Sequence, residues 1–314
     1  MNLFQSELRE PLPRRLNRRL SLLLALSLVA PCLAVGDDWP QFRGPGRDGI
    51  SNETNLLSKW SEDGPEVLWR RALGHGFSGI SVVERRLFTM YSDGSDEWLT
   101  AIDTASGRQL WRVHVDSNFS NDQGDGPRAT PTVASGVVYA LSAKGRLLAA
   151  AMDSGEELWK KDLKVEVGAK VPTWGVSTSP LVEGNLLILD AGGRPGASLV
   201  ALDRMTGDLV WKSGSDKAGY AAPIAIEVGG KRQILSFSGS RLSAVTPSTG
   251  EILWTKKWKT SWDVNAATPI FVPPDRVFVA SGYDTGAALL RVTSTDTDTR
   301  AEEVWRTRAM KNQF

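Results

Sequence analysis

Six tryptophans recur along this chain at similar intervals, and their period constrains the fold more than any other feature of the sequence. They are Trp69, Trp111, Trp159, Trp211, Trp254 and Trp305, spaced 42, 48, 52, 43 and 51 residues apart. Such a period indicates an array of similar units, each of which packs against its neighbours to bury a core. A unit of this length accommodates one four-stranded blade of a β-propeller. The spacing therefore predicts an all-β propeller with almost no helix after residue 36.

A short turn motif precedes several of these tryptophans at a fixed offset. The sequences AIDTASG and ALDRMTG end four residues before Trp111 and Trp211, and reduced forms precede Trp159 and Trp254. We expect the aspartate to accept hydrogen bonds from the backbone of the turn and the glycine to adopt a positive φ. The residues in these two roles are Asp103, Gly107, Asp203 and Gly207.

Four strands are expected within one repeat unit, and we place them in the second complete unit. They are Thr130–Ala134, Val137–Ser142, Arg146–Ala150 and Glu157–Leu163. After the glycine turn, the chain returns as the last strand, which carries the tryptophan. Because an indole buries a large apolar area, we expect all six repeat tryptophans to fill the gaps between neighbouring blades rather than to bind a ligand.

The turn motif and the tryptophan together resemble the repeat of the pyrroloquinoline-quinone (PQQ)-like β-propeller family. Three further segments resemble an exported bacterial subfamily with this repeat, and the likeness extends over residues 37–314. These segments are Asp38–Pro45, Lys170–Gly175 and Ser281–Gly286. The family includes quinone-dependent alcohol dehydrogenases, the propeller lipoprotein that assists outer-membrane barrel assembly, and members of unassigned role. The resemblance therefore implies the fold strongly and the activity weakly.

The number of blades follows from the intervals between tryptophans. Those ending at Trp111 and at each later repeat tryptophan give five complete blades. The resemblance implies a ring of about seven or eight blades, in which the strand at Trp69 would be the outer strand of the last blade. We therefore expect residues 37–314 to form a C-terminally truncated propeller domain. A genuine small propeller of five or six blades is the alternative.

The first 36 residues are expected to be a signal peptide. Five arginines precede the apolar run Leu20–Ala30, which as a helix would rise only about 16 Å, too short to cross a bilayer. The small residues Ala34 and Gly36 fit a cleavage site. We therefore expect an exported, periplasmic or cell-envelope protein without a transmembrane segment after cleavage. Arg18-Arg19 leaves the twin-arginine route open, and Cys32 is interpreted as part of the discarded peptide.

Composition excludes several classes of protein. Cleavage would remove five of 37 basic and two of 36 acidic residues, which leaves a formal charge of −2 and no cysteine. A chain without cysteine cannot carry a disulfide framework or a paired-cysteine metal site. A near-neutral chain also lacks the basic surface that nucleic acid binding requires. We therefore expect no nucleic acid partner.

The loops that lead into the innermost strands are richer in functional groups than the rest of each repeat. In a propeller these loops gather at the mouth of the central channel, and loops on a rigid scaffold commonly carry binding residues. Aromatic side chains beside cations could stack a planar or sugar ring and hold an anion there. Packing and salt bridges between blades are the structural alternative. The candidate binding residues are His75, Arg128, Lys170, Trp174, Tyr220, Trp262, Asp263 and Asn265.

Two hypotheses for the function follow. The favoured one is an exported scaffold that binds a protein, peptide or glycan through the channel-mouth loops, with no catalytic residue, metal ligand or cofactor assigned. The alternative is a dehydrogenase for alcohols or sugars that uses PQQ and Ca²⁺, where Ca²⁺ needs hard oxygen ligands. Asp263 and Asn265 are the one faint ligand pair. The resemblance implies a vicinal cysteine pair in true alcohol dehydrogenases, and the mature chain lacks it.

Overall fold

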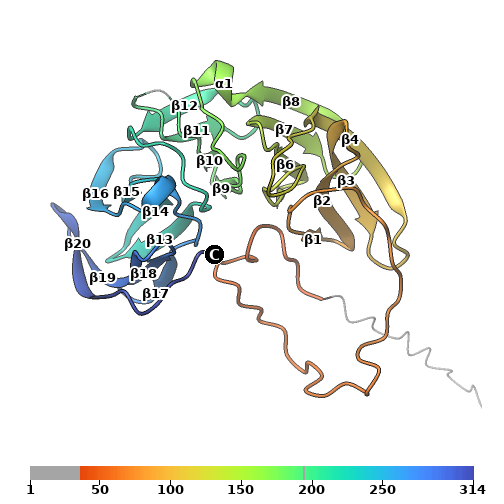
Figure 1. Ribbon diagram of the computed structural model, residues 1–314, viewed down its shortest axis with the longest axis horizontal. Helices are drawn as coiled ribbons and strands as arrows, with labels where there is room; N and C mark the ends of the chain where they lie inside the picture. Colours follow the sequence, from red (N-terminus) through yellow and green to blue (C-terminus); the bar gives the residue numbers. More distant parts are fainter. Residues whose placement is uncertain (1–35, 194) are drawn as a thin grey trace, which may run out of the picture. The chain divides into compact units, whose positions relative to one another are not determined.

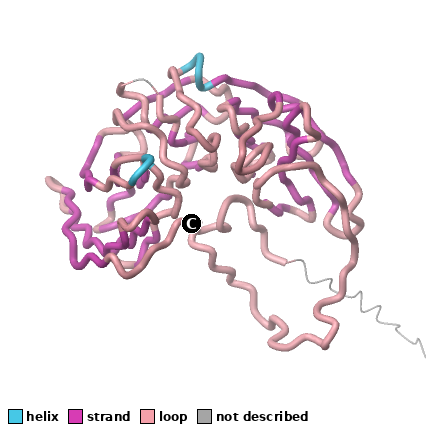
Figure 2. Tube along the Cα trace, viewed as in Figure 1, coloured by secondary structure: helices cyan, strands magenta, loops and turns pink. Residues whose placement is uncertain are grey.

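The structure is a computed structural model that describes residues 36–193 and 195–314. The predicted signal peptide lies outside the described residues, apart from Gly36. The compact unit Gly36–Phe314 contains five four-stranded antiparallel sheets, each formed by four strands consecutive in the chain. We call these sheets blades 1 to 5 in chain order. They follow one another around an arc that remains open between blade 5 and blade 1, as Figure 1 and Figure 2 show.

The strand bounds repeat from blade to blade. Blade 1 contains β1 (Ser81–Val83), β2 (Arg86–Ser92), β3 (Asp96–Asp103) and β4 (Gln109–Ser117). Blade 2 contains β5 (Thr132–Ala134), β6 (Val137–Leu141), β7 (Arg146–Ala151) and β8 (Glu157–Asp162). Blade 3 contains β9 (Leu181–Glu183), β10 (Leu186–Asp190), β11 (Leu199–Asp203) and β12 (Leu209–Ser213). Blade 4 contains β13 (Ile224–Val228), β14 (Lys231–Phe237), β15 (Arg241–Val245) and β16 (Ile252–Lys257). Blade 5 contains β17 (Ile270–Val272), β18 (Arg276–Ser281), β19 (Gly286–Ser294) and β20 (Thr299–Thr307).

The all-β prediction is confirmed, and so is the number of five blades. The four strands expected in the second unit agree with β5 to β8 to within two residues at each end. Helix within the described residues is confined to α1 (Leu163–Glu166) and the 3₁₀ turn η1 (Ser261–Asp263). Asp162 caps α1 by accepting a hydrogen bond from the Lys164 backbone N–H. The first strand of each blade lies nearest the axis of the arc, and the fourth lies at its outer rim (Figure 1).

Each blade has an irregularity at the same place, directly before its tryptophan. Trp111 pairs with Ala101 across β3 and β4, and Ile102 then pairs with Gln109, so that Leu110 is an extra residue in the outer strand. The same shift occurs in the other four blades. A bulge increases the local twist and bends the strand. It therefore sets the direction in which each tryptophan leaves the sheet.

The repeat tryptophans bridge neighbouring blades. The indole of Trp111 lies against Gly155 in the next blade and donates its N–H to the Met152 carbonyl at 3.1 Å. Three other tryptophans contact a glycine of the next turn in the same way: Trp69 on Gly107 with the Thr104 carbonyl, Trp159 on Gly207 with the Arg204 carbonyl, and Trp211 on Gly250 with the Pro247 carbonyl. In all four cases, the carbonyl acceptor belongs to the residue three positions before the contacted glycine.

Two repeat tryptophans do not dock in this way. Trp254 is buried but donates to the Gln233 side chain within its own blade at 3.0 Å. The reason is that blade 5 has no glycine turn at the corresponding position, where the sequence runs Thr295–Arg300. Trp305, on the outer strand of blade 5, is 41% exposed and packs on Phe278.

The residues around Trp69 differ from the sequence prediction. They were expected to form a strand, but the segment from Pro65 to Ala72 is irregular in the structure. It lies against blade 1 through the Trp69 indole, which donates to the Thr104 carbonyl at 2.8 Å. Strand structure requires a hydrogen-bonded neighbour, and no strand pairs with this segment within the described residues.

The core lies between the blades. One apolar cluster joins blades 2 and 3, with Tyr139, Leu147, Leu187 and Val200 fully buried. Similar clusters join blades 1 and 2, and blades 3, 4 and 5. Blades 2, 3 and 4 each lie between two neighbouring blades, and their inner strands are mostly apolar. Blades 1 and 5 have a neighbouring blade on one face only, and Ile270 and Val272 of β17 are exposed. The blades therefore form a rigid frame for the loops at the channel mouth.

Candidate functional site

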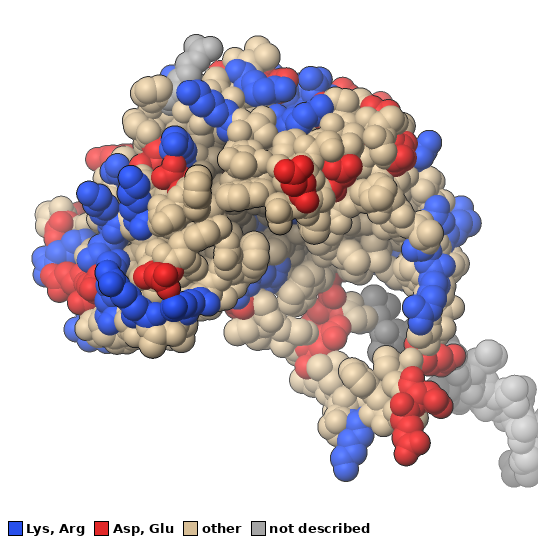
Figure 3. Space-filling model, in the orientation of Figure 1, with Lys and Arg blue, Asp and Glu red and all other residues tan. Residues whose placement is uncertain are grey.

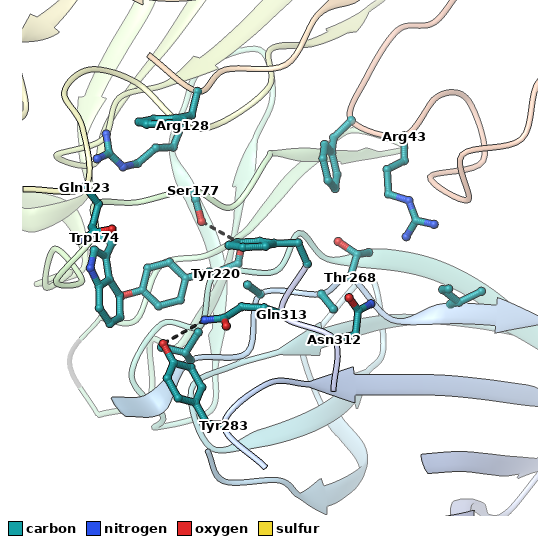
Figure 4. Close-up of a pocket in the computed structure, with 17 residues that line it drawn as sticks. Arg43, Gln123, Arg128, Trp174, Ser177, Tyr220, Thr268, Tyr283, Asn312 and Gln313 are labelled. Atoms are coloured by element: carbon teal, nitrogen blue, oxygen red, sulfur yellow. Dashed lines mark hydrogen bonds between the residues drawn. The ribbon is translucent and has the colours of Figure 1, made fainter. Parts of the chain in front are cut away.

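A cavity of about 1010 Å³ lies at the mouth of the channel. Aromatic side chains, amides and two arginines form its walls, and no aspartate or glutamate is among the described residues that line it (Figure 4). Its most prominent lining residues are Phe42, Arg43, Arg128, Trp174, Tyr220 and Tyr283.

The crossing segments, which run from the outer strand of one blade to the inner strand of the next, supply most of this lining. Arg128 lies on the segment after β4, Trp174 after β8 and Tyr220 after β12. The segment after β16 contributes Val264 and its neighbours, and the residues after β20 contribute Gln313. The propeller topology therefore brings groups distant in the sequence to one place.

One wall is aromatic. The rings of Trp174 and Tyr220 lie 5.8 Å apart at an interplanar angle of 52°. The Ser177 hydroxyl donates to the Tyr220 carbonyl at 3.0 Å, which holds the two crossing segments together. Burial raises the pKa of the Tyr220 hydroxyl. Next to this wall, the Tyr283 hydroxyl accepts a hydrogen bond from the Gln313 amide at 3.0 Å (Figure 4).

Arg128 is held firmly by its own loop. Its guanidinium lies over the rings of Phe77 and Phe119, 5.3 Å and 4.6 Å from their centroids. It also donates to the backbone carbonyls of Gly124 and Gly126. Burial lowers the pKa of this guanidinium. Arg128 therefore contributes a positive electrostatic potential to the cavity, while N–H groups of its guanidinium are hydrogen-bonded within the loop.

The eight residues singled out from the sequence are not gathered at one place. Arg128, Trp174 and Tyr220 line the cavity. His75 and Lys170 are exposed outside the lining, and Trp262 is 77% exposed in η1. Asp263 forms an ion pair with Lys217 at 2.8 Å. The binding role assigned to all eight stays a prediction.

Asn265 is fully buried, and its amide is used entirely within the fold. Its Nδ2 donates to the carbonyls of Ser238 and Trp258, at 2.8 Å and 3.2 Å. Its Oδ1 accepts from the Ser281 hydroxyl at 2.7 Å, and that hydroxyl in turn accepts from the Trp258 indole. With Asp263 paired to Lys217, this pair does not fit a Ca²⁺ site. Within the described residues, no three His, Cys, Asp or Glu side chains are placed to hold a metal ion.

Several lining residues were missed by sequence reasoning. Phe42 and Arg43 belong to the segment that served only to mark the family resemblance, and Tyr283 belongs to another such segment. Ser177 and Gln313 carried no signal of their own. One feature of the sequence could have identified Phe42, Arg43 and Tyr283. The segments that carry them lie outside the turn motif and the repeat tryptophans, so the structure of the blades does not explain these residues.

Two buried carboxyl groups outside the cavity have altered acidity. Burial raises the pKa of Glu97, at the start of β3, and that of Asp190, at the end of β10, to about 7. Each accepts one backbone hydrogen bond, from Ala143 and Gly219 respectively. The second oxygen of each has no hydrogen-bond partner among the described residues.

Charge is mixed over the blade surface in view. Lysine and arginine side chains alternate with acidic ones rather than forming a continuous basic face (Figure 3). None of the helices in the described part of the chain has the length and apolar character needed to span a membrane.

Sequence comparisons connect the chain to two groups of proteins. The family profile described as outer membrane protein assembly factor BamB matches residues 53–173 and 95–313. BamB of Burkholderia pseudomallei is 26% identical over 273 residues, which cover 72% of this chain and 68% of that protein. The quinoprotein alcohol dehydrogenase PedH of Pseudomonas putida is 26% identical over 157 residues, 48% of this chain but only 25% of its own length.

Solved structures show the same fold. BamB from Moraxella catarrhalis aligns with a TM-score of 0.52 at 19% identity, over 76% of this chain and 64% of that one. The quinohemoprotein alcohol dehydrogenase of Comamonas testosteroni aligns with a TM-score of 0.56 at 15% identity, over 81% of this chain and 46% of that one. The chain thus spans between about half and two thirds of these structures.

Proposed function

This chain belongs to the family of the outer membrane protein assembly factor BamB, and we propose that it is an exported propeller scaffold that binds a partner polypeptide at the mouth of its channel. The observation that supports this most directly is the cavity of about 1010 Å³, to which successive crossing segments contribute side chains. Sites that recognise other molecules commonly combine a rigid frame with loops of this kind.

The chemistry of the lining favours a polypeptide over a glycan. The rings of Trp174, Tyr220 and Tyr283 provide large apolar contact areas with polar edges, a combination enriched at protein interfaces. The amides of Gln123, Asn312 and Gln313 can pair with a peptide backbone. A cavity of about 1010 Å³ has room for several residues of an extended segment.

Photo-crosslinking in living cells tests this function. A photoreactive phenylalanine analogue replaces Tyr283 in the cavity or, as a control, Val165, which is 73% exposed on α1. We expect the Tyr283 position to crosslink a component or client of outer-membrane assembly that Val165 does not. The purified partner should then bind the Trp174→Ala variant at least tenfold more weakly. Equal crosslinking from both positions would contradict a binding role for the cavity.

Export is part of the same proposal. It rests on the basic and apolar pattern of residues 1–36, which lie outside the described residues except for Gly36. Mass spectrometry of the mature protein should find Asp37 or a near neighbour at the N-terminus. An intact Met1 in a protein retained in the cytoplasm would contradict export.

A quinoprotein activity is the second candidate, favoured by the matches to quinoprotein alcohol dehydrogenases. Against it, the Asn265 oxygen accepts from Ser281 and the Asp263 carboxylate is paired with Lys217. These residues do not fit the Ca²⁺ that such a cofactor site needs, so we derive no step of that reaction. Titration with PQQ and Ca²⁺, followed by absorbance and by dye reduction with alcohols, distinguishes the two candidates.

A further inference from the structure

The segment Trp39–Asp48, which we call the axial segment, lies on the inner side of the arc and touches four of its five blades (Figure 1). Trp39 exchanges two backbone hydrogen bonds with Val82 of β1, at 2.7 Å and 2.8 Å. The Pro40 carbonyl accepts from the Val133 N–H of β5 at 2.8 Å. The Arg47 side chain makes hydrogen bonds to the residues that lead into blades 3 and 4.

Arg47 joins blades 3 and 4 through its guanidinium. This side chain is only 3% exposed. Its Nη1 donates to the carbonyls of Ser179 and Pro223, at 3.2 Å and 2.9 Å, and its Nη2 donates to the Pro180 carbonyl. These carbonyls lie directly before β9 and β13, the innermost strands of the two blades. A planar guanidinium can make such contacts at once, whereas an ammonium group lacks this fixed geometry.

The charge of Arg47 is buried without a carboxylate partner, because its four acceptors are three carbonyls and the Gln41 amide oxygen. Burial lowers the pKa of the Arg47 guanidinium to about 9, so the group remains charged at neutral pH. A buried charge is tolerated when its donors are satisfied and becomes costly when the partners are lost. The arrangement therefore fixes the side chain in one position.

This anchor also fixes the loop that carries Phe42 and Arg43 into the cavity. The Gln41 amide accepts from Arg47 Nε at 2.9 Å and donates to the Pro45 carbonyl at 2.9 Å. Within the turn, the Arg47 N–H donates to the Gly44 carbonyl at 3.1 Å. Phe42 and Arg43 lie within this hydrogen-bonded turn and form one wall of the cavity.

Arg43 is the cation in that wall whose guanidinium has N–H donors available to a ligand. Its Nη2 donates to the Asp48 carbonyl at 3.0 Å, whereas a guanidinium has five N–H donors. The described lining contains no aspartate or glutamate side chain to pair with it. Arg128, on the other side of the cavity in Figure 4, adds a second positive charge to its lining. A ligand carboxylate would find a forked donor there, which is the geometry that arginine recognises best.

We propose that Arg47 is a positioning residue that holds Arg43 in the cavity wall, where Arg43 recognises a carboxylate in an acidic, aromatic-containing segment of the partner polypeptide. This inference rests on the proposed function. It adds the chemical class of the bound segment and the residue that makes the cavity selective for it.

Trypsin tests the positioning step without any ligand. In the native protein, the bonds after Arg43 and Arg47 should resist cleavage while those after Arg70 and Arg71, in the exposed segment, are cut. In Arg47→Gln the axial segment should be released, and cleavage after Arg43 should become at least tenfold faster. The control variant Arg85→Gln, at an exposed turn of blade 1, should retain the native pattern. Unchanged protection of Arg43 in Arg47→Gln would overturn the positioning role.

Peptide binding tests the recognition step. The probes are an acetylated hexapeptide of alternating Phe and Glu and its counterpart with Lys in place of Glu, titrated by calorimetry. We expect the native protein to prefer the acidic peptide by at least tenfold. Arg43→Gln, which has no tryptic site at residue 43, should lose that preference while the bond after Arg47 stays protected. Arg47→Gln should lose both the preference and the protection of the bond after Arg43. An equal affinity for the two peptides in the native protein would overturn the inference.

The outcomes separate this inference from the proposed function. If the crosslinked partner binds the cavity but Arg43→Gln leaves its affinity unchanged, the function stands and the recognition step is wrong. If Arg47→Gln fails to fold, hydrogen exchange in the native protein decides the positioning step. Slow exchange of the Trp39 and Val133 amides supports a docked axial segment, and exchange as fast as in the exposed segment 50–60 overturns it.

Discussion

A β-carbon added to Gly155 would lie 2.6 Å from the indole of Trp111, which belongs to the preceding blade. This glycine therefore has two separate requirements, a positive φ of 74° and an empty site for a neighbouring ring. Gly136 has the first requirement without the second, since its φ is 77° and no atom lies within 4 Å of the added carbon.

Gly155→Ala should therefore cost more stability than Gly136→Ala. Both variants pay about 1–2 kcal/mol for a left-handed backbone with a side chain. Gly155→Ala must also displace the Trp111 indole, for a total of about 2–4 kcal/mol in the free energy of unfolding. Urea titration monitored by tryptophan fluorescence measures both. Equal losses would mean that the ring can move aside freely.

Truncation of Trp211 should cost far more stability than truncation of Trp262. Trp211 is 7% exposed and docks on Gly250, so Trp211→Ala should lower the free energy of unfolding by about 3–5 kcal/mol. Trp262 is 77% exposed, and Trp262→Ala should cost less than about 0.5 kcal/mol. Thermal melts compare the two directly, and a similar loss in both would contradict the assignment of the repeat tryptophans to blade packing.

Asp190→Asn should stabilise the protein, and more so at higher pH. The folded-state pKa of Asp190 is raised from 3.8 to about 7 by burial. Between these values the unfolded chain loses the proton that the folded protein keeps, so native stability falls as pH rises through this window. An asparagine does not ionise and still accepts the Gly219 N–H. The advantage of the variant should grow by about 2 kcal/mol between pH 5 and pH 8.

Urea titrations of both proteins at the two pH values measure this difference. The contributions of the other ionisable groups cancel because the variant and the native protein are compared at the same pH. An advantage for Asp190→Asn that is constant with pH would show that the carboxyl group has an ordinary acidity in the folded protein.

Asn265→Ala should destabilise the blade 4 and blade 5 region. It leaves the Ser281 hydroxyl and two buried carbonyls without their partner, at a cost of about 2–3 kcal/mol. The control Asn121→Ala removes two exposed hydrogen bonds, one to the Thr173 carbonyl and one from the Gln123 N–H, and should cost less than about 1 kcal/mol. Calorimetric melts test the pair. A stable Asn265→Ala variant would mean that this amide serves something other than the fold.

The repeat could be predicted from the sequence because its physical causes are local. A tryptophan after a glycine turn specifies the bulge, the dock and the spacing of the strands within about fifty residues. The exception at Trp254 was visible in principle, since the turn before Trp305 contains no glycine. The irregular backbone around Trp69 could not be predicted, because a strand forms only beside a hydrogen-bonded partner strand. The local sequence does not show whether that partner is present.

The cavity could be predicted only in part, because the contacts that form it are not local in the sequence. Its side chains come from separate crossing segments, and whether one points inward depends on contacts formed across the fold. Arg128 carried the expected charge, but its stacking on Phe77 and Phe119 could not be read from spacing. Asn265 was singled out by residue type, and the sequence could not show that its amide is buried and hydrogen-bonded within the fold.

The contacts of the axial segment have a consequence for the order of folding. Arg47 bonds to carbonyls 132 and 176 residues further along the chain. During synthesis, this arginine leaves the ribosome long before Pro223 exists, and it can dock only after blade 4 has begun to form. Contacts between such distant residues slow folding, because the loop between them must close first. The segment at the start of the domain is therefore among the last parts to reach its native place, and nascent chains shorter than about 220 residues should hold it unprotected.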